Sequence, residues 1–213
     1  MHIEFLVEEP SAEAALQNLV PKICAGGITF DIHAYRSKTD LLSKLPKRLK
    51  GYGNFLPPDW RIVVLVDEDR EDCQFLKEKL DQAARDAGLV TKSMAQKGSR
   101  FQVLNRIAIE ELEAWFFGDV QAIHQAYERV SPSLATKSAY RDPDAIKGGT
   151  WEAMERELQR AGYFKSGLAK IKAARAISAH MVPSRNRSRS FQVFLQGLQN
   201  TLKQRAEEID LSP

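Results

Sequence analysis

One six-residue run, Arg61-Ile-Val-Val-Leu-Val66, constrains the fold of this chain more than any other feature. Five consecutive apolar, mostly β-branched residues must be buried on both faces, as in a central strand of a parallel sheet. The run stops abruptly at Asp67-Glu68-Asp69. Since parallel strands need crossover connections, usually helices, the run predicts an α/β protein.

Strand-like and helix-like segments alternate on both sides of this run. The pattern predicts strands at 3–7, 28–35, 61–66, 89–94 and 101–109, and helices at 12–24, around 41–49 and at 71–87. Ser11 is the expected N-cap of the first helix. This order predicts a Rossmann-like, mostly parallel sheet of four to five strands that is flanked by helices.

Beyond residue 109 the pattern is helical. Helices are expected through 112–116, at 120–130, 151–161, 167–180 and 191–208, with a connection at 131–149. We therefore divide the chain into an α/β domain at 1–118 and a basic C-terminal helical extension at 119–213, packed on or next to it.

The composition is that of a cytoplasmic globular protein. Apolar residues make up 43% and charged residues 28% of the 213 positions. No apolar run approaches the roughly 20 residues that span a bilayer, and the N-terminus does not resemble a signal peptide. Cys24 and Cys73 each stand alone, which indicates reduced thiols. We expect no membrane partner, and the sequence does not indicate an oligomeric state.

Charge is divided unevenly along the chain, although its net value is only +3. No acidic residue lies between Glu157 and Glu207, a stretch that is rich in Lys and Arg, and most carboxylates precede it. This division predicts a metal site in the first part and a polyanion, DNA or RNA, as partner of the second.

Carboxylates follow two of the predicted strands. Glu8 comes after the first strand, and Asp67 and Asp69 come after the central one. Functional groups collect at the carboxyl ends of strands in such sheets, and extended-chain alternation would point Asp67 and Asp69 the same way. Together the three acids predict a site for Mg²⁺ (or Mn²⁺). The alternative is that the two aspartates only cap the following helix.

The chain resembles the Toprim domain of topoisomerases, bacterial primases and nucleases of the overcoming-lysogenization-defect type. The resemblance lies in the order of an apolar strand, a glutamate, a helix and a second apolar strand that ends in Asp-x-Asp. That family commonly has glycine after the glutamate, and this chain has Glu9 there. The resemblance implies metal-dependent phosphodiester chemistry, and it leaves open whether Glu8 or Glu9 has the family's role.

A closer resemblance covers nearly the whole chain. The strand-Glu-Pro-Ser start, the Asp-x-Asp and the stretch Ile109-Glu-Glu-Leu-Glu-Ala-Trp-Phe-Phe-Gly-Asp119 are similar to a prokaryotic Toprim-like family known as domain of unknown function 4276. Its members are often encoded beside ATPases and are associated with phage defence or mobile elements.

Glu113 is the fourth candidate site residue. Its spacing from Glu110 predicts one shared helix face, and that face can either join the metal cluster or be an ordinary solvated surface. The residues alone do not decide between these two interpretations. The family resemblance favours Glu113 as a site residue.

Basic residues in two regions are candidates for binding a nucleic-acid backbone. Lys97 and Arg100 flank a Gly-Ser loop that can bind phosphate, or that is an ordinary exposed turn. The helical extension contributes Lys165, Lys172, Arg175, Arg185 and Arg187. These five residues can instead form a solubilising surface or a docking face for an acidic partner.

Several other chemistries lack their motifs in this chain. There is no P-loop and no nucleophile elbow, and His2, His33, His124 and His180 have no zinc-ligand spacing. We therefore expect a Mg²⁺-dependent Toprim-like nuclease. The alternative is a non-catalytic regulatory or effector subunit of the same fold that binds a partner ATPase.

Overall fold

The sheet of this protein has four parallel strands in the order β2-β1-β3-β4 in a computed structural model that describes residues 1–96 and 99–210. The strands are β1 (His2–Val7), β2 (Thr29–Ala34), β3 (Trp60–Asp67) and β4 (Val103–Ala108). The predicted α/β class with a parallel, Rossmann-like sheet is confirmed. The predicted strand at 89–94 is wrong, because this segment makes only an isolated bridge from Thr91 to Val103.

β3 occupies the interior of the sheet, between β1 and β4. Val63 lies opposite Phe5 on one side and Leu104 on the other. Alternate residues of β3 enter two separate hydrophobic cores, with Val63 and Leu65 in one and Ile62, Val64 and Val66 in the other. The apolar run is therefore buried on both faces, as its sequence predicts.

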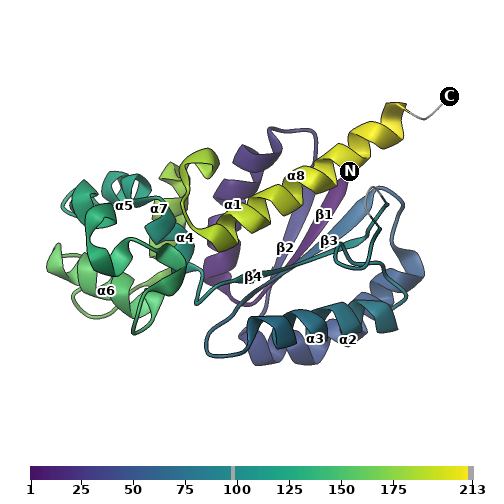
Figure 1. Ribbon diagram of the computed structural model, residues 1–213, viewed down its shortest axis with the longest axis horizontal. Coiled ribbons are helices and arrows are strands. Elements are labelled where there is room, and N and C mark those ends of the chain that lie inside the picture. Colours follow the sequence, from purple (N-terminus) through teal and green to yellow (C-terminus); the bar gives the residue numbers. More distant parts are fainter. Residues whose placement is uncertain (97–98, 211–213) are drawn as a thin grey trace.

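Two layers of helices cover the sheet (Figure 1). α2 (Lys38–Phe55) and α3 (Cys73–Asp86) cover one face, and α1 (Pro10–Cys24) and α8 (Arg189–Asp210) cover the other. α1 starts two residues earlier than predicted. Glu9 is its N-cap and Pro10 takes the first helical position, so Ser11 lies in the buried first turn and donates its hydroxyl to the Glu9 carboxylate.

A group of shorter helices lies beyond the carboxyl ends of the strands, at the left of Figure 1. It contains α4 (Glu113–Gly118), α5 (Val120–Ala126), α6 (Thr150–Arg160) and α7 (Lys170–His180). α5 is shorter than predicted, and the connection at 131–149 contains three 3₁₀ turns, η1 (Pro132–Thr136), η2 (Ser138–Tyr140) and η3 (Pro143–Ala145). A fourth, η4 (Pro183–Arg185), connects α7 to α8.

The helical extension and the sheet share one hydrophobic core. Trp115 of α4 contacts Phe191 and Phe194 of α8, with ring centroids 5.2 and 4.9 Å away. The same core includes α1, β1 and β4. The carboxyl ends of the strands therefore lie between the sheet and the helical extension, which are packed against each other. None of the helices within 1–96 and 99–210 has both the length and the hydropathy to cross a lipid bilayer.

Candidate functional site

Glu8 and Asp67 meet at the carboxyl ends of neighbouring strands. Glu8 follows β1, Asp67 is the last residue of β3, and the Asp67 backbone N–H donates to Glu8 Oε2 at 3.0 Å. Burial raises the pKa of Glu8, the hydrogen bond from Asp67 opposes this, and the charge of Asp69 raises it further. Of the two adjacent glutamates, Glu8 is therefore the one that is bonded to the end of β3.

Asp67 is the electrostatic centre of the cluster. Burial raises its pKa well above the usual range, and the nearby charges of Glu8, Glu113, Glu9 and Asp69 raise it further, in that order. Mutual repulsion of this kind requires carboxylates from β1, β3 and α4 to lie near one another. The fold thus brings the four predicted site acids, Glu8, Asp67, Asp69 and Glu113, near one another, together with Glu9, the alternative to Glu8.

Asp69 joins the cluster by a different geometry from the one expected. β3 ends at Asp67, and Asp69 has a left-handed backbone with φ of 53°. The argument from extended-chain alternation is therefore wrong beyond Asp67. Instead, the Asp69 N–H donates to the Glu110 carbonyl at 2.8 Å, and its carboxylate Oδ2 lies 2.5 Å from Lys38 Nζ.

Lys38 is a buried cation that the sequence did not indicate. Its ammonium group donates to the Glu68 carbonyl at 3.0 Å and lies 3.3 Å from Glu71 Oε1, besides its contact with Asp69. Burial lowers the pKa of Lys38, but the hydrogen bond and charge of Asp69 outweigh this, so the pKa is raised overall. Lys38 starts α2, and only the parallel pairing of β2 with β1 brings it to the acids.

Glu113 is buried at the start of α4, with 2% of its surface exposed. Its Oε2 atom has no hydrogen-bond partner within the described part of the chain. Burial raises the pKa of Glu113 to about 7, against the opposing charge of Lys170. Glu110 does not share a helix face with it, because Glu110 precedes α4 and has a φ of 59°.

Two other acids of the same stretch have structural roles. Glu111 Oε2 accepts hydrogen bonds from the N–H of Thr150, the Thr150 hydroxyl and the N–H of Trp151, at 2.7–2.9 Å, so it caps α6. Asp119 caps α5 and forms a two-bond ion pair with Arg185, at 2.7 and 3.0 Å. Both carboxylates are therefore engaged in holding the short helices together.

A cleft of about 890 Å³ opens beside the acids, between the start of α1 and the start of α7. Glu9 lies on one side, and Lys170, Lys172 and Arg175 lie on the other. Burial lowers the pKa of Lys170, but the charges of Glu113, Glu9, Glu111 and Asp67 outweigh this and raise it. Lys170 Nζ also lies 5.3 Å from the centre of the Trp151 ring. Sequence analysis missed Lys170 as a site residue, although the start of an acid-free basic helix was a usable signal.

The other predicted basic residues are scattered. Lys172 and Arg175 line the cleft, and Lys165 is exposed in the loop before α7. Arg185 is paired with Asp119, and Arg187 is exposed. Arg100 is exposed and precedes β4, so it lies at the opposite edge of the sheet from the acids. Lys97 lies outside the described residues.

The carboxylate oxygens of the acid cluster are farther apart than the ligand atoms of a bound metal would be. Within the described residues, no three of its carboxylates have ligand oxygens that all lie within 4.8 Å of one another, whereas His2, Glu4 and Asp31 do. All of the cluster's donors are carboxylate oxygens, the ligand type that Mg²⁺ and Mn²⁺ prefer. Burial first, and then repulsion between the carboxylates, raises the pKa values of Glu8 and Asp67, and a cation at this site would offset both effects.

A family model described as a domain of unknown function (DUF4276) matches residues 7–199, a range that includes all the acids of the cluster and α7. Neither the curated proteins nor the solved structures include a match.

Proposed function

The chain belongs to the DUF4276 family, and because that description names no activity, we propose from the site itself that the protein is a Toprim-like, Mg²⁺-dependent nuclease. One observation carries the proposal. Glu113 places a buried carboxylate oxygen, without a hydrogen-bond partner among the described residues, near Asp67 at the end of β3, which itself lies beside Glu8. Leaving such an oxygen without a partner is costly, and a water molecule held by a cation at Glu8 and Asp67 would supply one.

The donor set fits a hard divalent cation. Glu8 and Asp67 would hold Mg²⁺ (or Mn²⁺), and Asp69 would join them if it exchanged its bond to Lys38 for the metal. Mg²⁺ at such a site supplies charge stabilisation at a phosphoryl oxygen and lowers the pKa of bound water.

The residues of the chain then divide the remaining work. Glu113, with a pKa of about 7, can take up or release a proton near neutral pH, as a general acid or base must. Before the metal binds, Lys38 holds the Asp69 carboxylate in place. Lys170, Lys172 and Arg175 line the cleft beside the acids and would bind the phosphates of the substrate backbone, DNA or RNA.

Cleavage of labelled single- and double-stranded DNA and RNA, with Mg²⁺ or Mn²⁺ and with EDTA, tests the proposal. We expect metal-dependent cleavage that is lost in Asp67→Asn and Glu8→Gln and retained in Glu128→Gln, a substitution of an exposed glutamate. Far-UV circular dichroism would establish that each variant folds. Cleavage that persists in Asp67→Asn, or that does not need metal, would refute the proposed active site.

A second candidate is a regulatory or effector subunit that binds an ATPase encoded nearby, with a possible place in phage defence. One observation favours it. Phe55 of α2 and Phe75 of α3 are 86% and 66% exposed, on the sheet face opposite to α1 and α8. Unpaired aromatic side chains of this kind are enriched at protein interfaces. Absence of cleavage, together with co-purification that Phe75→Ser abolishes, would favour this candidate over the nuclease.

A further inference from the structure

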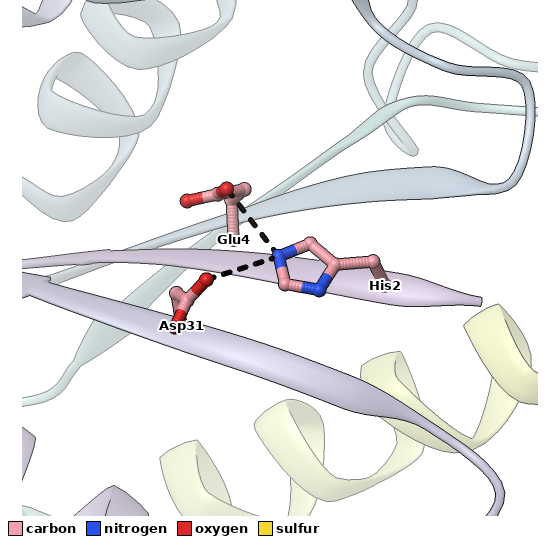
Figure 2. A group of neighbouring side chains, drawn as sticks. All are labelled: His2, Glu4 and Asp31. Atoms are coloured by element: carbon pink, nitrogen blue, oxygen red, sulfur yellow. Dashed lines mark hydrogen bonds and ion pairs between the residues drawn. The ribbon is translucent and has the colours of Figure 1, made fainter.

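We propose that His2, Glu4 and Asp31 form a second cation site, specific for a divalent transition metal such as Zn²⁺. The three side chains project from the first halves of β1 and β2 and converge on one point (Figure 2). His2 Nε2 lies 3.3 Å from Glu4 Oε1 and 3.6 Å from Asp31 Oδ2.

These separations fit zinc coordination. With zinc–nitrogen and zinc–oxygen bonds of about 2.0–2.2 Å, the ligand atoms of a tetrahedral site are roughly 3.3–3.6 Å apart. All three ligand atoms lie within 4.8 Å of one another, so an ion between His2 Nε2 and the two carboxylate oxygens would reach bonding distance after side-chain movements of about 1 Å. Three protein ligands would leave the fourth position to water or to another ligand.

Two of the three ligands already have the outer partners that metal ligands require. His2 Nδ1 is 2.8 Å from Thr29 Oγ1, and His33 Nε2 is 2.5 Å from the second Glu4 oxygen, Oε2. When His2 Nδ1–H donates to the Thr29 hydroxyl, the Nε2 lone pair faces the Glu4 and Asp31 carboxylates. A cation bound by all three groups would remove the repulsion between the lone pair and the two negative charges. The Trp60 ring, 4.1 Å from the His2 ring, further fixes the imidazole.

The sheet register assembles this site. His2 pairs with Thr29, and Glu4 pairs with Asp31, so the four side chains share one face of two adjacent parallel strands. The spacing of the histidines along the sequence gives no sign of this. Glu4 is 6% exposed, whereas the Asp31 side chain is 69% exposed, so the site combines a buried anion with an open route for the metal.

The site is separate from the acid cluster in place and in chemistry. Glu4 precedes Glu8 by four residues along β1, which is about 13 Å at roughly 3.3 Å per strand residue. An imidazole nitrogen with two carboxylates suits Zn²⁺, while the all-carboxylate cluster suits Mg²⁺. Zinc here would join edge strand β2 to β1, which is a structural role.

Cobalt is a direct probe, because tetrahedral Co²⁺ bound to nitrogen and oxygen ligands absorbs visible light. The full chain, without an oligohistidine tag and stripped of metal, would be titrated with Co²⁺ and then with Zn²⁺ in competition. We expect one tetrahedral Co²⁺ per chain, displaced by Zn²⁺. His2→Gln should abolish binding, and Asp31→Asn should weaken it at least about tenfold.

Removing an outer partner tests the assembled site. Thr29→Val, a replacement that suits a strand, should weaken the metal about 10- to 100-fold, as loss of an outer partner does elsewhere. The matched controls are His180→Gln, at an exposed histidine of α7, and Glu128→Gln, at an exposed glutamate, and both should leave the tetrahedral Co²⁺ absorption unchanged.

The same variants define what would overturn the site. If Co²⁺ gives no tetrahedral spectrum, His2, Glu4 and His33 form only a hydrogen-bonded network. If the tetrahedral spectrum survives His2→Gln or disappears in His180→Gln, the metal lies elsewhere. Zinc should also raise the thermal midpoint of the wild-type protein and not that of His2→Gln, and equal shifts in both would contradict the proposal. None of these readouts depends on nuclease activity.

Discussion

Replacing Glu113 with glutamine is expected to stabilise the protein at alkaline pH, although Glu113 belongs to the candidate active site. Its carboxyl group is buried in the folded chain with a pKa of about 7, against a usual value of 4.5. Below pH 4.5 both folded and unfolded chains carry the proton, and the neutral acid costs little. As the pH rises from 4.5 to 7 the unfolded chain ionises first, so the folded state loses relative stability.

The size of this loss follows from the pKa difference. The shift from 4.5 to about 7 at about 1.4 kcal/mol per pKa unit corresponds to about 3.4 kcal/mol in full. Between about pH 5 and about pH 8, roughly 2.5 kcal/mol of it should be observed. Glutamine has the same shape and no charge to desolvate. The variant should therefore gain about 2.5 kcal/mol on the wild type between these two pH values.

Urea unfolding of both proteins at the two pH values, in EDTA, measures this double difference. Since the other titrating groups are common to both proteins, the comparison isolates Glu113. Glu128→Gln is the control, because that glutamate is exposed, and it should change with pH in parallel with the wild type. Parallel pH profiles for Glu113→Gln and the wild type would show that the carboxyl is not a buried acid with a raised pKa.

Three further outcomes follow from particular contacts. Lys172→Gln and Arg175→Gln, in the wall of the cleft, should each weaken nucleic-acid binding and lower the slope of log affinity against log salt concentration by about 1. The control Lys79→Gln, on α3, should change neither the affinity nor the slope. Fluorescence anisotropy at several salt concentrations measures both, and an unchanged slope would place the substrate elsewhere. Arg185→Ala should lower the free energy of unfolding by about 1–3 kcal/mol, because it removes two hydrogen bonds from the buried Asp119 carboxylate. It should not change the salt dependence of nucleic-acid binding. A changed salt dependence with unchanged stability would mean that Arg185 binds phosphate. Gly53→Ala should destabilise the protein by about 1–3 kcal/mol in urea unfolding, because the new Cβ would lie 2.1 Å from the Ala87 carbonyl oxygen. Gly51→Ala, on the same helix but with open space around it, should be neutral or stabilising. Equal effects of the two substitutions would contradict this packing.

The sheet could be predicted because its information is local. The apolar run at 61–66 requires burial on both faces, and the alternation of strand and helix then fixes a parallel sheet. The segment 89–94 failed for a physical reason. Its residues suit a strand, but its pairing with β4 is confined to one bridge, in which Val90 and Lys92 bond to Val103, and the chain then turns. Strand propensity without continuous pairing to a neighbouring strand does not make a strand.

The acids of the site could be found from their positions at strand ends, but their partners could not. Lys38 reaches Asp69 only through the pairing of β2 with β1, and the cluster of His2, Glu4 and Asp31 depends on the same pairing. The sequence likewise could not show that Arg185 is used by Asp119 or that Glu111 caps α6. Each of these is a contact between distant segments, and residue spacing carries no information about it.

The cleft depends on the packing of α1 against α7, because these two helices form its opposite walls. Lys22 of α1 fixes that packing by donating to the carbonyls of Ser178, Ala179 and Met181 at the end of α7, at 2.7–2.9 Å. Asn18, one turn earlier, donates to the Arg175 carbonyl and to the Ser178 hydroxyl. A cation is favourable at a helix C-terminus, and the Lys22 ammonium group bonds to three carbonyls at the end of α7. The basic start of α7 is thereby held beside Glu9, so α1 both begins at the acid cluster and positions the cations that lie opposite it. The uneven charge along the sequence thus places Glu9 opposite Lys170, Lys172 and Arg175 across one cleft.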